Sequence, residues 1–198
     1  SGLARHADSD TYDVHDLIRE FLLQSLDKQA KEELHNKAVS WYDKQLPSSQ
    51  IALELIYHLI ASSRHEDATE LVVEQGRNLI KEGHIELLGL LESIDTQSVA
   101  AESACRVDRL RGEVLALLGR FDEAEEAFNL AKVPAEAAGL SDVIADILSN
   151  LADIALKRGD SEESLGMHRK ALELFISMKD AIGAARSYNN MGYILRRN

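Results

Sequence analysis

The sequence is poor in the residues that mark secreted, membrane-spanning or proline-rich proteins. Cys105 is the only cysteine among 198 residues, so no disulfide can form within the chain, which fits a reducing compartment. The chain has only two prolines, and this scarcity favours helix throughout. No apolar run approaches the length of about 18 residues that a membrane span needs, and no charged-then-apolar leader opens the chain. We therefore expect a cytoplasmic, mainly helical protein that does not bind membranes.

Basic residues are scarce relative to acidic ones. The chain has 34 acidic and 22 basic side chains, which gives a net charge of −12. Such a chain repels phosphate backbones, so we do not expect direct binding of nucleic acid. Arginines nevertheless gather at 106–111 and at 186–197. These clusters are most simply solvated helix faces, and the alternative is that they bind acidic partners.

The motifs of catalysis and metal binding are missing from the sequence. It contains neither a GxxxxGK[ST] phosphate-binding loop nor a G-x-S-x-G nucleophile turn. The histidines His35, His58, His65 and His84 are too widely spaced for a local metal site. We therefore expect no enzyme activity, no metal and no cofactor in this chain.

What the sequence does contain is an internal repeat with a period of 40 residues. Residues 110–131 have the spacing of two amphipathic helices joined by a turn at Gly119. Gly112 and Ala124 predict a close approach of these helices, with Phe121 and Phe128 filling the space beside them. A fixed period of about 20–50 residues is typical of stacked helical hairpins. The same phases return 40 residues later: Gly112 as Ala152 and Gly192, Gly119 as Gly159, and Ala131 as Ala171.

This order of small residue, glycine turn, alanine, aromatic and alanine resembles the tetratricopeptide repeat, whose usual length is about 34 residues. Three positions depart from the pattern: Arg111 stands at an apolar position, Ser164 replaces the small alanine, and His168 replaces the aromatic residue. The alternative is a non-repeating helical bundle in which glycine and alanine recur by coincidence. The expected fold is all-α, a right-handed solenoid of helical hairpins, with a small β-hairpin at the N-terminus.

The sequence ahead of the clear repeats also has helical spacing. Helices are expected at 27–46, 50–62 and 85–94, and Gly76 and Gly83 are expected to delimit a short helix between the last two. Residues 51–75 have the features of a degenerate repeat, with Ala68 at the small position of its second helix. The apolar stripe of the first of these helices is expected to face inward, and it contains Leu34, Ala38, Trp41, Tyr42 and Leu46.

Residues 12–22, YDVHDLIREFL, resemble the end of the winged-helix domain in the STAND class of signalling ATPases. This class includes apoptosome-type, plant disease-resistance-type and maltose-regulator-type proteins. Its Val/Met-His-Asp motif is matched by Val14-His15-Asp16, and Trp41-Tyr42 and Tyr57-His58 then follow in the order of the maltose-regulator branch. The resemblance implies that His15 contacts the β-phosphate of ADP and that Asp16 orients the turn. The nucleotide, ATP or ADP, would belong to the full-length protein, and the alternative is that His15 only caps a helix.

These observations divide the chain into a winged-helix remnant at 1–26, a helical arm at 27–98 and tetratricopeptide-like repeats at 99–198. The repeats stop after the first helix of a hairpin, so we expect the chain to be a piece of a longer protein. The expected function is that of a non-catalytic interaction or ligand-sensing domain of a STAND-type ATPase. The alternative is a stand-alone tetratricopeptide adaptor or scaffold.

The first helix of each hairpin lines the concave surface of such a solenoid, so this surface is the predicted binding site. The expected occupant is a peptide, a partner protein or a small inducer. Arginines there can hold carboxylates, and asparagines can read a peptide backbone, unless they cap or bridge neighbouring repeats. Exposed apolar faces at the ends of the array would also promote homo-oligomers. The predicted groove residues are Arg106, Arg109, Glu113, Asp146, Ser149, Asn150, Asp153, Arg186, Asn189, Asn190 and Tyr193.

Overall fold

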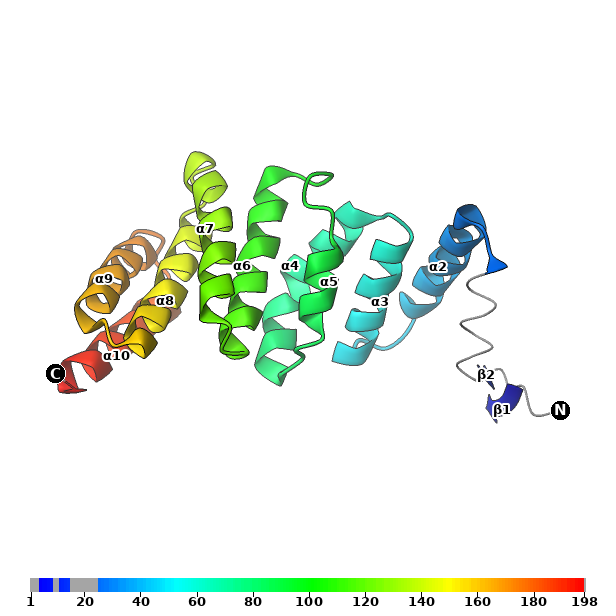
Figure 1. Cartoon of the computed structure of the whole chain (residues 1–198), viewed down its shortest axis with the longest axis horizontal. Helices are drawn as coiled ribbons and strands as arrows, with labels where there is room; N and C mark the ends of the chain where they lie inside the picture. Colours follow the sequence, from blue (N-terminus) through cyan, green and yellow to red (C-terminus); the bar gives the residue numbers. More distant parts are fainter. Residues whose placement is uncertain (1–3, 9–10, 15–24, 198) are drawn as a thin grey trace.

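The computed structural model describes residues 4–8, 11–14 and 25–197 of the chain. The helices of this part stand side by side along the long axis of the molecule, from α2 at one end to α10 at the other (Figure 1). None of these described helices is both long enough and apolar enough to cross a membrane. In order they are α2 (Lys28–Tyr42), α3 (Ser49–Ala61), α4 (His65–Glu82), α5 (Leu87–Ser93), α6 (Ala101–Leu117), α7 (Phe121–Ala137), α8 (Ser141–Arg158), α9 (Ser161–Ser177) and α10 (Ala181–Arg197).

A short antiparallel pair of strands precedes the helices. Strand β1 (Ala4–Asp8) pairs with β2 (Thr11–Val14), and Ala4 lies opposite Val14 in this register. The Val-His-Asp motif begins at the last residue of β2. His15 and Asp16, the residues to which the STAND resemblance gives a role, lie outside the described residues.

The period of 40 residues in the sequence is the period of the helices. Helices α6, α8 and α10 begin at residues 101, 141 and 181, and α7 and α9 begin at 121 and 161. Gly119 and Gly159 end the first helix of each hairpin with φ angles of 76° and 95°, a conformation that glycine adopts without steric cost. Lys179 has a φ of 59° where the preceding hairpin has Gly139. The predicted all-α solenoid of helical hairpins is therefore confirmed.

Close contact between α6 and α7 depends on Gly112. A Cβ atom at this position would lie 2.6 Å from Cε1 of Phe128, so a side chain cannot be added unless the ring moves. Ala124 and Phe128 are completely buried, whereas Phe121 is half-buried at the edge of the core. In the next hairpin His168 occupies the place of Phe128 and is also completely buried.

Gly76 does not end a helix, which corrects one expectation from the sequence. Helix α4 runs through it and ends at Glu82, before Gly83. Gly76 is buried, and a Cβ atom there would lie 2.8 Å from Cδ1 of Leu110 on α6. The glycine therefore serves the close packing of α4 on α6 and does not serve as a break.

The expected inward face of the first arm helix is also wrong in part. Helix α2 ends at Tyr42 rather than at residue 46, and its buried residue is Val39. Because α2 lies at the end of the row with α3 as its main neighbour, only the stripe that faces α3 is covered. The residues predicted to be inside but found exposed are Leu34, Trp41 and Leu46.

A pair of histidines joins α2 to α3. Nδ1 of His35 lies 2.7 Å from Nδ1 of His58, so one neutral imidazole donates a hydrogen bond to the other. The Tyr42 ring stacks on His58, with the ring centroids 5.5 Å apart. Burial lowers the pKa of both imidazoles; the charge of His35 lowers that of His58 further, while Glu54 opposes the shift. The contact between these helices therefore favours two neutral rings.

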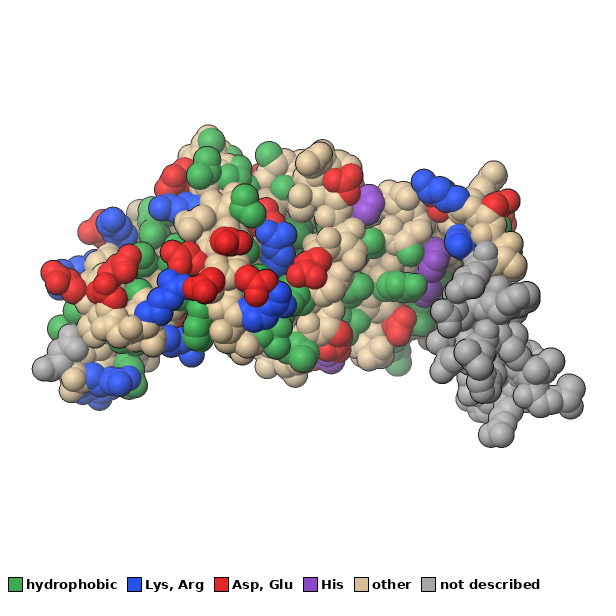
Figure 2. Space-filling view, in the orientation of Figure 1, with side chains coloured by type: hydrophobic (Ala, Val, Ile, Leu, Met, Phe, Trp, Pro, Cys, Tyr) green, Lys and Arg blue, Asp and Glu red, His purple; other side chains and the backbone are tan. Residues whose placement is uncertain are grey.

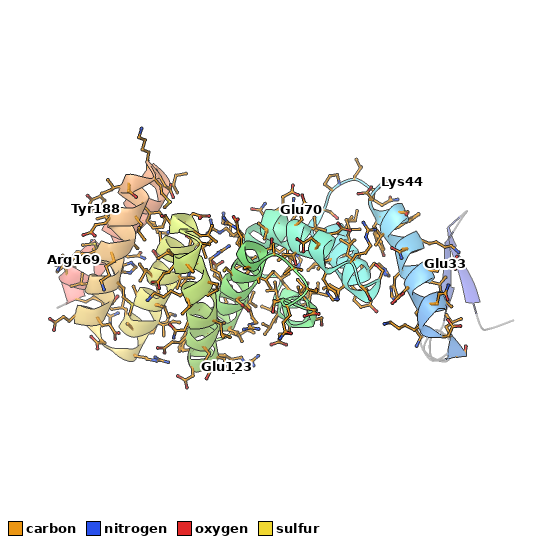
Figure 3. The ribbon with its side chains drawn as sticks, turned by 90° about the horizontal axis from the view of Figure 1, so that it is seen from above. Glu33, Lys44, Glu70, Glu123, Arg169 and Tyr188 are labelled. Atoms are coloured by element: carbon orange, nitrogen blue, oxygen red, sulfur yellow. The ribbon has the colours of Figure 1, made fainter. Side chains whose placement is uncertain are left out.

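Polar side chains of both signs cover the outside of the row. On the face in Figure 2, acidic and basic side chains are interleaved over the central helices. One example is Arg158 on α8, which binds Glu125 at 2.6 Å and Asp122 at 2.5 Å on α7. Figure 3 shows the side chains from above and labels Glu33, Lys44, Glu70, Glu123, Arg169 and Tyr188 along the row.

Candidate functional site

A groove runs across the inner ends of four helices that stand next to one another or one hairpin apart. Its volume is about 790 Å³, and α4, α6, α8 and α10 supply most of its lining. Apolar side chains such as Ile80, Phe121 and Ile154 form part of the wall, and charged side chains form the rest. The charged residues of the lining are Arg77, Lys81, Arg106, Arg109, Lys157 and Arg186 on the basic side, and Glu113, Asp142, Asp146, Asp153 and Asp180 on the acidic side.

The predicted groove residues gather on this surface with two exceptions. Asn189 and Tyr193 lie outside the lining, which ends on α10 at Asn190. Tyr193, at the far end of α10, accepts a hydrogen bond of 2.9 Å from Arg197 one turn later. The predicted residues that line the groove are Arg106, Arg109, Glu113, Asp146, Ser149, Asn150, Asp153, Arg186 and Asn190.

Asp146 stands at the centre of the groove and binds two arginines from different helices. Its Oδ2 accepts a hydrogen bond from Nη2 of Arg77 on α4, and its Oδ1 accepts one of 3.2 Å from Nη2 of Arg186 on α10. The two arginines reach α8 from opposite sides, since α4 and α10 flank it in the row. A single carboxylate thus ties three helices together across the groove.

A second ion pair lies almost completely buried beside the first. Arg109 donates from Nη1 to Glu113 Oε1, and its Nε has no partner among the described residues. Burial lowers the pKa of the Arg109 guanidinium, the Glu113 carboxylate opposes this effect, and the positive charges of Arg77 and Arg106 lower the pKa further. The guanidinium groups of this region therefore repel one another, although each has an acidic neighbour.

Arg106 anchors the edge of the groove between α6 and α8. It donates to Asp142 Oδ2 at 2.7 Å and to Glu102 Oε1 at 3.2 Å. Burial alone would raise the pKa of Asp142, but the hydrogen bond and the charge of Arg106 outweigh it and lower that pKa. Asp142 therefore stays ionised and already has a cationic partner.

The two asparagines of the groove make contacts within the solenoid. Asn150 donates to the backbone oxygen of Asp146 at 2.9 Å, and Asn190 on α10 donates to Asp153 on α8 at 3.3 Å. Asp153 Oδ1 also lies 3.3 Å from Nε2 of His168, but without the alignment of a hydrogen bond. Asn190 thus bridges neighbouring hairpins, which was the alternative to a role in reading a peptide.

The sequence prediction missed the contribution of α4, chiefly Arg77 and Lys81. Residues 51–75 were interpreted as a degenerate repeat with α4 as its second helix, so no groove residue was expected there. A signal was present nonetheless. Arg77 follows Gly76 as Glu113 follows Gly112, 36 residues later, and this spacing differs from the period of 40.

Comparison with known proteins supports the description of the repeats. Residues 143–198, which contain α8, α9 and α10, match the family model described as "Tetratricopeptide repeat". No curated protein matches the chain in sequence. Among solved structures, the chain is similar to that described as "Crystal structure of BtubC (BKLC) from P. vanneervenii", with a TM-score of 0.55 and 19% identity. That likeness covers 87% of this chain and 67% of the other.

At this level of identity the structural likeness concerns the fold alone. The fold, the 40-residue period of the helices and the family match over the last three helices all agree. The chain is an all-α helical repeat solenoid that is tetratricopeptide-like.

Proposed function

We propose that this chain is a non-catalytic interaction domain that binds a segment of a partner protein in the groove between α4 and α10. The observation that carries this proposal is the convergence of polar side chains from four helices on one groove with apolar wall residues. Concave surfaces of this kind, with a few charged groups among apolar ones, are the usual binding sites of stacked helical hairpins. The match to the tetratricopeptide repeat supports it, because repeats of that kind bind proteins or peptides.

Two buried polar groups support a binding role over a purely structural one. Ser149 Oγ and Arg109 Nε have no hydrogen-bond partner among the described residues, although both residues belong to the groove lining. Leaving such groups unpaired costs about 1–3 kcal/mol each. A groove selected only for stability would have replaced them with apolar side chains.

The experiment is a selection from a random library of 12-residue peptides on the folded chain, followed by hydrogen–deuterium exchange of the complex. Binding in the groove protects amides of α6, α8 and α10 and leaves those of α7 unchanged. Protection confined to α7 and the outer face of α9 would contradict the proposal. So would a selection in which no peptide is enriched.

We propose further that the domain serves as the sensing arm of a STAND-type signalling ATPase. The support is the sequence alone: Val14-His15-Asp16, then the aromatic-histidine pairs of the arm, then the repeats, in the order of that class. In this setting a ligand that prefers the open state would shift the population toward it and release the contact of His15 with ADP. The nucleotide would be held mainly by residues outside this sequence, which has no phosphate-binding loop.

The gene sequence upstream of Ser1 tests this setting. A glycine-rich Lys-Ser/Thr loop within about one ATPase domain's length, on the order of 300 residues, would support it. A His15→Ala variant of that full-length protein is then expected to be constitutively active. If the upstream sequence encodes no such loop, the stand-alone adaptor is the better description, and the groove proposal is unaffected.

A further inference from the structure

At the centre of the groove the acid is buried and the bases are exposed. The side chain of Asp146 is 10% exposed, whereas those of Arg77 and Arg186 are 47% and 52% exposed. Each guanidinium uses one nitrogen, Nη2, to bind Asp146, and the remaining N–H donors have no partner among the described residues. A molecule that enters the groove therefore meets guanidinium donors first.

The surroundings of this centre carry an excess of positive charge. Arg77, Arg106, Arg109 and Arg186 face three acidic side chains, Glu113, Asp142 and Asp146. The whole chain has the opposite balance, with a net charge of −12. An anion placed between these guanidinium groups would reduce their mutual repulsion.

We propose that the groove binds an acidic segment of a partner protein, whose Asp or Glu side chain lies between the guanidinium groups of Arg77 and Arg186. This inference rests on the proposed function of the groove as a peptide site. Asp146 acts as a positioning residue, because it holds two arginines from helices on either side of α8 next to each other. The planar fork of an arginine fits a carboxylate with two parallel hydrogen bonds, so two such forks form a specific site for it.

A basic segment is the occupant that the net charge of the chain would favour at long range. That field is screened over about 8 Å at physiological ionic strength, so contacts in the groove decide the preference. The more exposed acids of the lining already have partners, since Asp142 binds Arg106 and Asp153 accepts from Asn190. A cationic side chain would have to displace these partners, whereas a carboxylate finds unused donors.

The test uses peptides from the 12-residue library, resynthesised with amidated C-termini and measured by fluorescence anisotropy. Enriched peptides are expected to carry Asp or Glu. Replacing those residues by Asn or Gln is expected to weaken binding by about tenfold or more, the usual effect of losing a charge-assisted hydrogen-bonded pair. This arm needs no protein variant, so it does not depend on the folding of a mutant.

A second arm uses the variants Arg77→Ala and Arg186→Ala, each of which leaves Asp146 one arginine partner. Both are expected to weaken binding by about tenfold or more. Arg158→Ala is the matched control: this arginine on α8 is also ion-paired, with Glu125 and Asp122, but it lies outside the groove lining, so its removal leaves the affinity unchanged. Melting curves of all variants report whether each is folded.

The outcomes separate this inference from the proposal on which it rests. Peptides that protect the groove but are basic or uncharged, or that bind Arg77→Ala and Arg186→Ala as well as the unaltered chain, would overturn the acidic occupant and leave the peptide groove intact. A library without any groove-dependent peptide would overturn both.

Discussion

The packing of α6 on α7 at Gly112 allows a prediction with an internal control. Gly112 and Gly192 occupy the same phase of the repeat, but their surroundings differ. A Cβ atom at Gly112 would meet three ring carbons of Phe128 at 2.6–2.9 Å, whereas a Cβ atom at Gly192 has nothing within 4 Å. Gly112→Ala and Gly192→Ala are therefore the same substitution in a filled and in an open site.

The expected magnitudes follow from two opposing effects. Replacing glycine by alanine within a helix stabilises it by about 0.5–1 kcal/mol, because the unfolded chain loses more freedom at glycine. Overpacking a buried site costs about 1–3 kcal/mol. Gly112→Ala is thus expected to lower the free energy of unfolding by about 1–2 kcal/mol, and Gly192→Ala to raise it by about 0.5–1 kcal/mol.

Urea unfolding followed by far-ultraviolet circular dichroism measures both changes. In a thermal scan the loss at Gly112 corresponds to a decrease in Tm of about 2–8 °C for a chain of this size. If Gly112→Ala were as stable as the unaltered chain, the Phe128 ring would not be packed against α6 as described. If Gly192→Ala were destabilising, the corresponding face of α10 would be covered in solution.

Three further substitutions or conditions test other parts of the account. His168→Phe is expected to raise the free energy of unfolding by about 1 kcal/mol or more, because a buried ring without hydrogen bonds gives way to the aromatic residue of the preceding hairpin; a loss in urea unfolding would contradict this. Lys179→Gly is expected to add about 0.5–1 kcal/mol by relieving the left-handed φ of 59°, and an unchanged urea midpoint would contradict it. For the His35–His58 pair, the folded pKa values lie below the ordinary 6.5, so the unfolded chain binds more protons and stability is lost as the pH falls below about 6.5. Amide exchange in α2 is expected to accelerate over that range, and a His35→Gln, His58→Gln double variant that kept the same pH dependence would refute the assignment.

The sequence predicted the features that repeat and the features that are local. The period of 40 residues, the turn at Gly119 and the packing of Phe128 on Gly112 all follow from spacing, because each hairpin meets the same neighbours. The predicted helix at 50–62 differs from α3 by one residue at each end. These features depend on residues that are close in sequence.

The features that the sequence did not predict depend on position in the row. Gly76 has the composition of a helix break, and only the presence of Leu110 beside it makes it a packing residue. Trp41 and Leu34 have the spacing of an inner face, but a terminal helix has a neighbour on one side only. Arg77 binds Asp146 across 69 residues, a distance that no periodic pattern encodes.

The central claim is that the groove between α4 and α10 binds a peptide, and site-specific photo-crosslinking tests it most directly. Leu117 on α6 lines the groove and is 62% exposed, whereas Leu130 on α7 is 59% exposed and lies outside the lining. A photoreactive phenylalanine at each position, with a library-selected peptide added, compares two equally accessible sites. The account predicts crosslinks at position 117 and none at position 130. Crosslinks at 130 alone would contradict it.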